Sequence, residues 1–332
     1  MIKKKSLSEL RMDLVSGDWV IIATGRARRP EAFAEKKRNK EAVSSKYCPF
    51  CQPKILDKAV LKYDQSDGSW FVFSMPNDFP AFSKGDKLNE RKEGPNRIMD
   101  GIGYQEVVVT ADHEKQIAQF SKKEIKMVVD TYQGRYLNLM RNDFVKYISI
   151  FHNHGEEAGA SIAHPHSQII AIPVLDPDLK GSLDGAENYY RNNGKCVYCT
   201  MIDWEIKDGR RVIYKNDKFV VLCPFASQVS FEVRVYPKDH KAYFEEITEK
   251  EKEFFVDALQ QALSRVYKGL KDPAYNFYIH TAPCDKQGYE RYHWHLNILP
   301  KTSVWAGFEL GAGIEISTIE PEKAAEFLRK IK

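Results

Sequence analysis

The chain has 332 residues, 43% of them hydrophobic, which is enough for two ordinary domains or one large one. Its 50 Lys and Arg residues are dispersed among 46 Asp and Glu residues, giving a formal net charge of +4 and a sequence pI near 8.5. This balance argues against a nucleic-acid-binding tail and suits a protein that attracts small anionic substrates. No stretch approaches the ~18 apolar residues of a membrane span, and no apolar signal region follows the basic start, so we expect no membrane association and a cytoplasmic location.

The first half predicts several strands and one long helix. A strand over 19–22 leads into a basic turn with Arg26, Arg28 and Arg29, which is either a solvated loop or a phosphate-binding loop, since a guanidinium matches phosphoryl oxygens. Strands are predicted over 70–73, 104–110 and 145–151, and a helix over 122–141, where apolar residues recur at helical spacing.

The stretch 151–172, FHNHGEEAGASIAHPHSQIIAI, ends this half. In an extended segment the side chains of His164, His166 and Gln168 share one face. Two imidazoles and an amide therefore lie beside a loop whose small residues allow a ligand to approach the backbone. Taken alone, the pattern fits either a polar strand face or a nucleophile with an orienting group on each side.

The second half repeats the order of the first. A strand over 219–222, a strand over 232–236, a helix over 248–268, and strands over 275–281 and 293–300 follow a second pair of Cys residues. The offsets agree: His240 follows His113 by 127 residues, and His293 follows His164 by 129. An internal duplication is the economical explanation. Strands, then a helix, then strands in each half predict an α+β fold with a mainly antiparallel sheet. We expect repeats over 1–180 and 190–332, joined by an Asp-, Gly- and Asn-rich connector near 174–194.

Two Cys-x-x-Cys pairs in a long chain without a secretory signal indicate metal sites or redox pairs rather than a disulfide framework. Each pair is followed by an Asp-His and a His-x-His sequence, and of the His donors in the first half we select His113 and His164, whose counterparts His240 and His293 are placed in the same way. Four such ligands close a tetrahedral zinc site with no open position, so we predict two structural zinc sites. Their ligands are Cys48, Cys51, His113 and His164 in the first, and Cys196, Cys199, His240 and His293 in the second.

The segment GASIAHPHSQ, with Asn153 before it, resembles the histidine-triad superfamily, in particular the hexose-1-phosphate nucleotidyltransferases that include galactose-1-phosphate uridylyltransferase and ADP-glucose phosphorylase. The resemblance covers nearly the whole chain and implies two histidine-triad-like repeats that form open half-barrel sheets, and a homodimer. Histidine-triad hydrolases usually carry a third His where this chain has Gln168, which favours transfer over hydrolysis. The second metal site resembles the two-zinc relatives and departs from uridylyltransferases that hold iron there.

If zinc binds His164, then His166 is the free imidazole, which is nucleophilic near pH 7. We predict a covalent nucleotidyl-histidine and a ping-pong cycle, with Gln168 and Ser161 stabilising the phosphoryl charge. The leading hypothesis is a UDP-glucose:hexose-1-phosphate uridylyltransferase of galactose metabolism, and the alternative is an ADP-glucose phosphorylase with the same histidine chemistry. The expected partners are thus a nucleotide sugar and a sugar 1-phosphate or phosphate. A zinc-ribbon module that binds nucleic acid or protein is the rival from another class, and the even charge distribution counts against it.

The resemblance also implies substrate-binding residues. Arg26 and Arg29 match nucleotide-contacting positions that in some members reach across a dimer interface. Asn77 and Asp78 match positions that hold the base and ribose. The alternative interpretation of Asn77 and Asp78 is a turn between prolines. The remaining matches are Phe151 and Asn153, in the same pocket, and Phe308 and Glu309, which match contacts to the hexose. Ser303-Val304 and Glu315 depart from the uridylyltransferase pattern, and GFELGAG is nearer to the ADP-glucose phosphorylase form, so uracil and adenine both stay open, as does the hexose.

Overall fold

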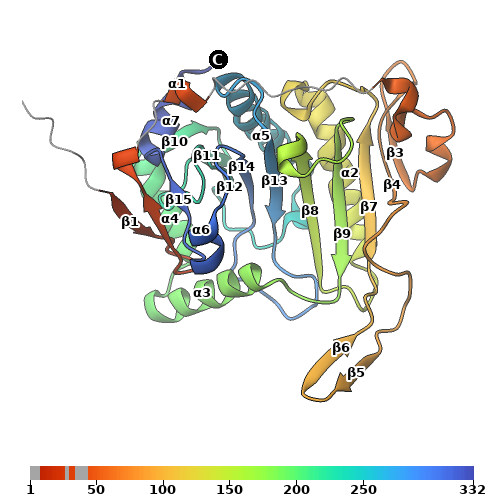
Figure 1. The fold of residues 1–332 in the computed structure, drawn as a ribbon, viewed down its shortest axis with the longest axis horizontal. Helices are drawn as coiled ribbons and strands as arrows, with labels where there is room; N and C mark the ends of the chain where they lie inside the picture. The colour runs from red at the N-terminus through yellow and green to blue at the C-terminus, as the bar shows by residue number, and fades with distance from the viewer. Residues whose placement is uncertain (1–7, 27–29, 34–43) are drawn as a thin grey trace, which may run out of the picture.

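The computed structural model describes residues 8–26, 30–33 and 44–332. Ten strands form one antiparallel sheet that stays open at both edges, in the order β10-β11-β12-β14-β13-β8-β9-β7-β4-β3 (Figure 1). The first half of the chain supplies β3 (Leu61–Asp64), β4 (Trp70–Pro76), β7 (Tyr104–Thr110), β8 (Tyr147–His154) and β9 (His166–Ile172). The second half supplies β10 (Val212–Lys215), β11 (Phe219–Leu222), β12 (Val233–Pro237), β13 (Tyr275–His280) and β14 (His295–Pro300).

The strand order is that of a duplicated sheet. Each half contributes five strands in the same internal order, and the halves meet where β8 pairs antiparallel with β13. Ile150 is paired with Ile279 across this seam, and these two residues are 279 − 150 = 129 positions apart, the same offset as His164 and His293. The predicted α+β class with two duplicated repeats is therefore confirmed. We retain 1–180 and 190–332 as the proposed boundaries of the repeats.

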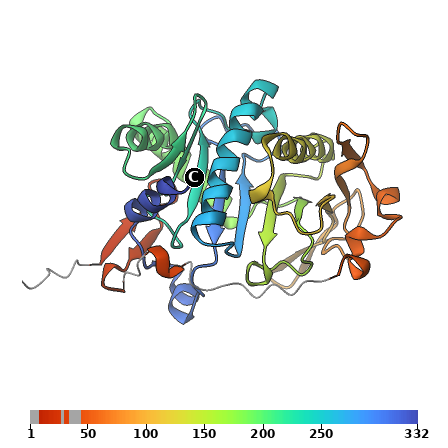
Figure 2. The same ribbon diagram turned by 90° about the horizontal axis from the view of Figure 1, so that it is seen from above.

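Two helices cover one face of the sheet. α2 (Lys122–Leu139) and α5 (Glu249–Gly269) occupy equivalent places in the two repeats and lie on the same side of it (Figure 2). Each begins with a capping box, Ser121 with Glu124 and Thr248 with Glu251, which satisfies backbone N–H groups at the helix start. Their buried apolar faces and the inward side chains of the strands form one core, which stabilises the sheet through the removal of apolar surface from water.

A second core lies on the opposite face of the C-terminal half. There α3 (Pro177–Asn193) and α4 (Val197–Asp208) pack Leu179, Tyr198 and other side chains against Val220 and Tyr236 of the sheet. Helix α3 occupies most of the predicted connector, so that segment is a helix and not merely a linker. Its signals are present in the sequence: the Asp176 side chain accepts a hydrogen bond from the Leu179 N–H at 2.8 Å, and a glycine in left-handed conformation ends the helix.

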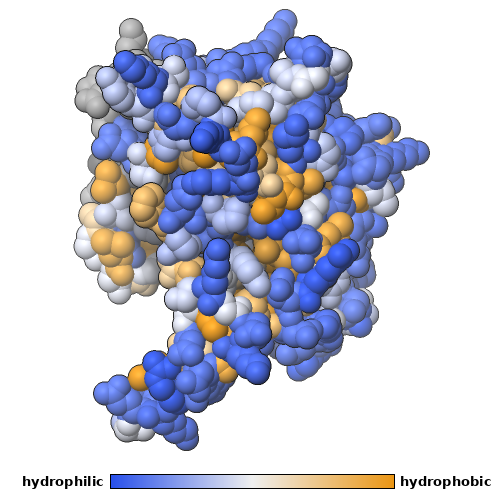
Figure 3. Space-filling model, turned by 90° about the vertical axis from the view of Figure 1, so that its right-hand side faces the viewer, coloured by the Kyte–Doolittle hydropathy of each residue, from blue (hydrophilic) through white to orange (hydrophobic). Residues whose placement is uncertain are grey.

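The remaining elements lie around this sheet. A small sheet joins β1 (Glu9–Met12) and β2 (Trp19–Ile22) to β15 (Ile316–Ser317), so the first strands pair with the C-terminal part of the chain. The short helices are α1 (Pro30–Phe33), α6 (Gly307–Ala312) and α7 (Pro321–Lys330). A hairpin of β5 (Glu90–Glu93) and β6 (Asn96–Met99) projects from the body (Figure 1), and its surface is mostly hydrophilic (Figure 3). Among the described residues, no helix combines the length and apolar character needed to cross a membrane.

Candidate active site and metal centres

The first group of predicted metal ligands converges at the edge of the N-terminal repeat. Cys48 and Cys51 flank a 3₁₀ turn, His113 follows β7 and His164 precedes β9. The Nδ1 atoms of the two His residues are 3.2 Å apart, and the Sγ of Cys51 is 3.3 Å from Nδ1 of His113 and 3.4 Å from Nδ1 of His164. Tetrahedral ligands around zinc, with bonds of about 2.0–2.3 Å, lie about 3.3–3.8 Å apart. The four side chains therefore fit a tetrahedral metal ion.

The second group has the same arrangement in the C-terminal repeat. The ligand atoms of Cys196, Cys199, His240 and His293 all lie within 4.8 Å of one another. The Sγ of Cys199 is 3.3 Å from Nδ1 of His240 and 3.8 Å from Nδ1 of His293. Both groups of the described chain are thus candidate metal centres of the same geometry, and both are compatible with zinc.

The hydrogen bonds around the two groups fix which ring nitrogen faces the ion. Nε2 of His164 lies 2.6 Å from the Thr110 carbonyl, and Nε2 of His293 lies 2.9 Å from the Pro237 carbonyl. Because a carbonyl can only accept, Nε2 carries the proton and Nδ1 presents its lone pair to the Cys residues. Orientation of a ligand imidazole by a second hydrogen bond is typical of metal sites.

His166 is the first residue of β9 and points to the side of the sheet opposite α2. Its Nδ1 lies 2.9 Å from the His164 carbonyl oxygen, so Nδ1 carries the proton and Nε2 carries the lone pair. The ring is 8% exposed and packs edge-on against Phe50 at 5.1 Å between centroids. Burial lowers the pKa of His166, against a smaller opposing effect of the His164 carbonyl, so the imidazole is neutral near pH 7. The turn between the metal-binding Cys residues thus also supports this ring.

Gln168 lies two residues further on the same face, half-buried and paired across the ladder with Phe151 of β8. Asn153 follows on the same face of β8, and its Oδ1 accepts a hydrogen bond of 2.8 Å from Nδ2 of Asn276 on β13. Asn276 also donates to the Ala158 carbonyl at 2.7 Å, in the loop before His166. No motif in the sequence indicates a role for Asn276. Its equivalent in the first repeat, 129 positions earlier, is a tyrosine, so the duplication carried no signal for it.

Of the other predicted residues of the first half, Asn77, Asp78 and Ser161 lie in loops at the surface. Asn77 follows β4 and accepts a hydrogen bond from the Phe79 N–H at 2.9 Å, so the segment is a turn, as the alternative interpretation had it. Asp78 forms an exposed ion pair with Lys58 at 2.8 Å. Ser161 is exposed in the loop that leads to His166. Arg26 ends a short 3₁₀ turn after β2, and Arg29 lies outside the described residues.

Phe308 and Glu309 lie on α6, in the C-terminal repeat. The Phe308 side chain is 50% exposed, and the Glu309 carboxylate accepts a hydrogen bond of 3.1 Å from the Ala306 N–H at the start of the same helix. The structure therefore brings His166, Gln168, Phe151 and Asn153 together on one face, while Phe308 and Glu309 sit on a separate exposed helix.

His295 is the counterpart of His166 in the second repeat. It forms the equivalent hydrogen bond to the backbone, with Nδ1 3.1 Å from the His293 carbonyl oxygen. Its surroundings differ, because its ring lies between Tyr236 and His280 at centroid distances of 4.9 and 5.0 Å, beneath Tyr198 of α4. Burial lowers the pKa of His295 well below its usual range and that of His280 to about 4. Both imidazoles are therefore neutral near pH 7, with His295 buried and His280 half-buried.

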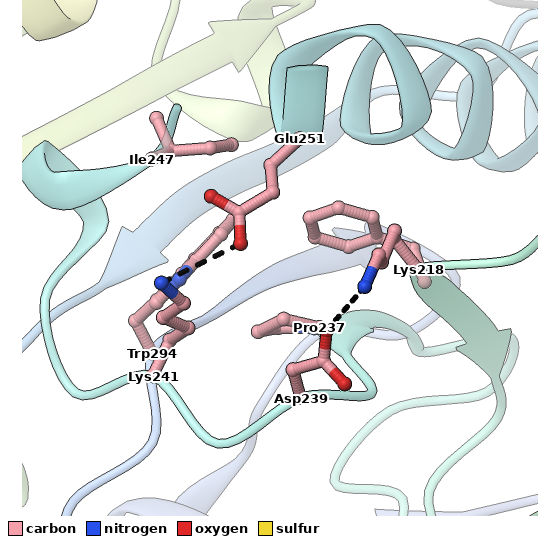
Figure 4. A pocket seen from close by; sticks show the side chains of 8 residues that line it. Lys218, Pro237, Asp239, Lys241, Ile247, Glu251 and Trp294 are labelled. Carbon is pink, nitrogen blue, oxygen red and sulfur yellow. Dashed lines mark hydrogen bonds and ion pairs between the residues drawn. The ribbon is translucent and has the colours of Figure 1, made fainter. Parts of the chain in front are cut away.

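Two cavities lie away from His166. One of about 10 Å³, room for at most one water, is enclosed by Trp294 and the ion pairs of Lys218 with Asp239 and Lys241 with Glu251 (Figure 4). An open groove of about 820 Å³ lies between the β5–β6 hairpin, α3 and the segment after β9. At about 3.3 Å per residue, that end of β9 is about 20 Å from His166. None of the predicted site residues that the structure describes lines either cavity.

The fold and its paired Cys/His groups define a duplicated α+β protein with two candidate metal centres. A sequence model described as galactose-1-phosphate uridyl transferase, N-terminal domain, matches residues 1–175, and one described as a domain of unknown function (DUF4921) matches residues 107–330. The chain is 32% identical to ADP-glucose phosphorylase of Arabidopsis thaliana over 330 residues, covering 97% of this chain and 93% of that protein. It is 29% identical to galactose-1-phosphate uridylyltransferase of Thermotoga maritima, covering 98% of each.

A solved structure of an ADP-glucose phosphorylase from Arabidopsis thaliana with bound ADP-glucose superimposes with a TM-score of 0.81 at 29% identity, covering 98% of this chain and 99% of that chain. The similarity in sequence and the similarity in fold both extend over nearly the whole length. The chain belongs to the galactose-1-phosphate uridyl transferase family.

Proposed function

We propose that the protein transfers a nucleotidyl group from a nucleotide sugar to a second phosphate, with His166 as the covalent carrier. The observation that supports this most directly is the hydrogen bond of its Nδ1 to the His164 carbonyl, which leaves Nε2 as a lone-pair donor. The preferred reaction is that of a UDP-glucose:galactose-1-phosphate uridylyltransferase in galactose metabolism.

The reaction balances in two displacements. In the first, Nε2 of His166 attacks the α-phosphorus of UDP-glucose, the P–N bond forms, and the bond to the bridging oxygen breaks to release glucose 1-phosphate. In the second, a phosphate oxygen of galactose 1-phosphate attacks the same phosphorus, the P–N bond breaks, and UDP-galactose leaves. The leaving oxygen of the first displacement belongs to a phosphate, and the leaving group of the second is the His166 imidazole, so neither step requires a strong general acid.

The other predicted residues have supporting roles in this proposal. Gln168 and Ser161 donate hydrogen bonds to the phosphoryl oxygens, whose negative charge grows in the transition state. Asn77 and Asp78 hold the base and ribose beside Phe151 and Asn153, which requires Asp78 to exchange its exposed partner Lys58 for the ligand. The remaining proposed contacts are Arg26 and Arg29 to the nucleotide, in part across a homodimer interface, and Phe308 and Glu309 to the hexose.

Zinc is the metal we propose for both centres, because thiolate and imidazole donors in tetrahedral array suit it. A bound ion would have four protein ligands at each centre. It would connect the Cys-bearing segment to the His residue that immediately precedes β9 in the first repeat and β14 in the second. In the N-terminal repeat, His164 would join this loop to His166 two residues later, which holds the nucleophile in place. We further propose a homodimer in the cytoplasm as the working form.

A second candidate function is that of an ADP-glucose phosphorylase. Its support is the 32% identity to the Arabidopsis protein of that name, above the 29% to the Thermotoga uridylyltransferase. The first displacement is unchanged except for the base, and inorganic phosphate replaces the sugar phosphate in the second, so ADP leaves. The two candidate functions therefore differ in the base of the donor nucleotide and in the phosphate compound that accepts the nucleotidyl group.

The test is the covalent intermediate. The protein is incubated with UDP-glucose or ADP-glucose alone, quenched in alkali because a P–N bond is labile to acid, and its intact mass is recorded. His166→Ala should abolish the adduct, whereas His295→Gln, in the equivalent strand of the second repeat, should leave it in place.

A uridylyl adduct supports the uridylyltransferase, and an adenylyl adduct supports the phosphorylase. Release of the nucleotidyl group by galactose 1-phosphate or by phosphate then identifies the acceptor. If neither donor yields an adduct or a sugar 1-phosphate, the covalent mechanism is wrong for this protein. An adduct that survives in His166→Ala would place the nucleophile elsewhere.

A further inference from the structure

The side-chain amide of Gln168 is held by a second glutamine. Nε2 of Gln105, at the start of β7, donates a hydrogen bond of 2.8 Å to Oε1 of Gln168. Oε1 of Gln105 in turn accepts a hydrogen bond of 2.9 Å from the Ala81 N–H. Both glutamines are half-buried and lie on the face of the sheet that also bears His166.

The Ala81 N–H fixes the orientation of both glutamine amides. A backbone N–H can only donate, so the atom of Gln105 that faces Ala81 is the oxygen, and the atom that faces Gln168 is the nitrogen. Gln168 must then turn its oxygen toward Gln105. Its two N–H donors point away from Gln105 and are available to a ligand on the open face.

Gln105 also joins two parts of the proposed site. Its backbone carbonyl accepts a hydrogen bond of 2.8 Å from the Asn77 N–H, and its side chain holds the Ala81 N–H four residues later. Between these two bonds the segment is exposed, with Phe79 92% exposed. One residue therefore anchors both ends of the proposed base-binding segment and the amide beside the nucleophile.

We propose that Gln105 is a positioning residue for nucleotidyl transfer, and that it acts by keeping the Gln168 amide in the orientation that presents N–H donors to the phosphoryl oxygens. The inference deepens the proposed function and rests on it. A donor aimed at charge that develops in the transition state contributes about 10²–10³-fold to a rate, and the same amide turned over would present an oxygen instead.

The structure predicts an unusual order of effects for two substitutions. Gln105→Leu removes the preference for either orientation of the Gln168 amide. It should slow adduct formation at a saturating concentration of nucleotide sugar by about tenfold, which is less than the loss expected when a hydrogen-bond donor to the phosphoryl group is removed entirely. Gln105→Glu keeps the shape but offers only acceptors, so Gln168 turns its nitrogen to residue 105 and its oxygen to the phosphate. We expect a loss of about 100-fold, with donor affinity changed much less. If residue 105 served only to fill space, the isosteric Glu would be tolerated better than Leu.

A double-mutant cycle separates orientation from the added negative charge. In the background of Gln168→Ala, Gln105→Glu should have little further effect, because the amide through which it acts is gone. The rate measured is that of adduct formation in a single turnover with whichever of UDP-glucose and ADP-glucose labels the wild-type protein. The melting temperature and metal content of each variant are recorded to show that the fold is intact.

The outcomes distinguish this inference from the function on which it rests. A wild-type protein that forms no adduct with either donor would overturn both. An adduct in the wild type, with Gln105→Glu as fast as Gln105→Leu or faster, would overturn the role of Gln105 alone. A full effect of Gln105→Glu in the Gln168→Ala background would assign the loss to charge and would likewise overturn it. Glu slower than Leu, with the effect lost in that background, supports the proposal.

Discussion

Glu245 should make the folded protein less stable as the pH rises from mildly acidic to mildly alkaline. The residue lies in a short turn before α5, and its side chain is only 8% exposed. The Thr281 hydroxyl donates to this carboxylate, with Oγ1 3.4 Å from Oε2, at the long limit of a hydrogen bond. Burial, reinforced by the neighbouring Glu246, raises the pKa of Glu245 to about 7.

The sign follows from the proton balance. A carboxyl group with a higher pKa in the folded than in the unfolded state binds its proton more tightly when folded, so stability falls between the unfolded value near 4.5 and the folded value near 7. At about 1.36 kcal/mol per pH unit, the full penalty at alkaline pH is about 3 kcal/mol. Of this, about 2.5 kcal/mol develops between pH 5 and pH 8.

Glu245→Gln removes the titration and can keep the contact with Thr281. The free energy of unfolding of this variant minus that of the wild type should therefore rise by about 2–3 kcal/mol from pH 5 to pH 8, measured by urea unfolding in metal-saturated buffer. Contributions from the metal ligands cancel in this difference. Glu246→Gln, at an exposed position next to it, is the control: it removes only the smaller cause of the raised pKa of Glu245, so its difference should rise with pH by much less. A rise for Glu245→Gln no larger than that of this control would refute the reasoning.

Three further predictions concern other parts of the molecule. A Cβ at Gly185 of α3 would lie 1.8 Å from the Val15 carbonyl oxygen, so Gly185→Ala should lower the melting temperature. A Cβ at Gly181 would meet nothing within 4 Å, so Gly181→Ala should stabilise the protein by about 0.5–1 kcal/mol. Equal effects of the two substitutions on the melting temperature would refute this packing. Cys199→Ser should lower the metal content from two ions per chain to one and destabilise the protein by several kcal/mol. The variant should still form the His166 adduct. Two ions per chain in the variant would refute the ligand assignment. Asn276→Leu should slow adduct formation by about tenfold without loss of metal, since it removes two hydrogen bonds at the site, and an unchanged rate would show that they do not support it.

Elements with strong periodicity were predicted well, and elements without it were not. The helices α2 and α5 and the strand β7 begin and end within about two residues of their predicted bounds, because apolar side chains at regular spacing face a core. Helix α3 was missed because Gly181 and Gly185 lower its intrinsic preference, and its polar residues resemble a linker. The β5–β6 hairpin was also missed, since it projects from the body and has no buried face to produce an alternating pattern.

The two candidate metal centres could be predicted from sequence because their Cys and His residues occur in short motifs that the duplication repeats at a nearly constant offset. Gln105 and Asn276 carry no such signal. Their side chains meet Gln168 and Asn153, which are 63 and 123 residues away, and an isolated amide in a strand has no characteristic pattern. Contacts of this kind arise from the register of the sheet, which local sequence does not specify.

The duplication explains why one repeat can hold the candidate site while the other supports it. In a single repeat, β8 would be an edge strand with unpaired N–H and C=O groups, and the loop after it would have no neighbour. Pairing with β13 places β8 in the centre of the sheet and brings Asn276 against Asn153 and the Ala158 carbonyl. The equivalent face of the second repeat is covered by α3 and α4, which bury His295. The two halves thus share the same candidate metal-binding frame and differ in what covers the histidine: the turn that bears Phe50 packs on His166, which is 8% exposed, and α4 packs on His295, which is 5% exposed.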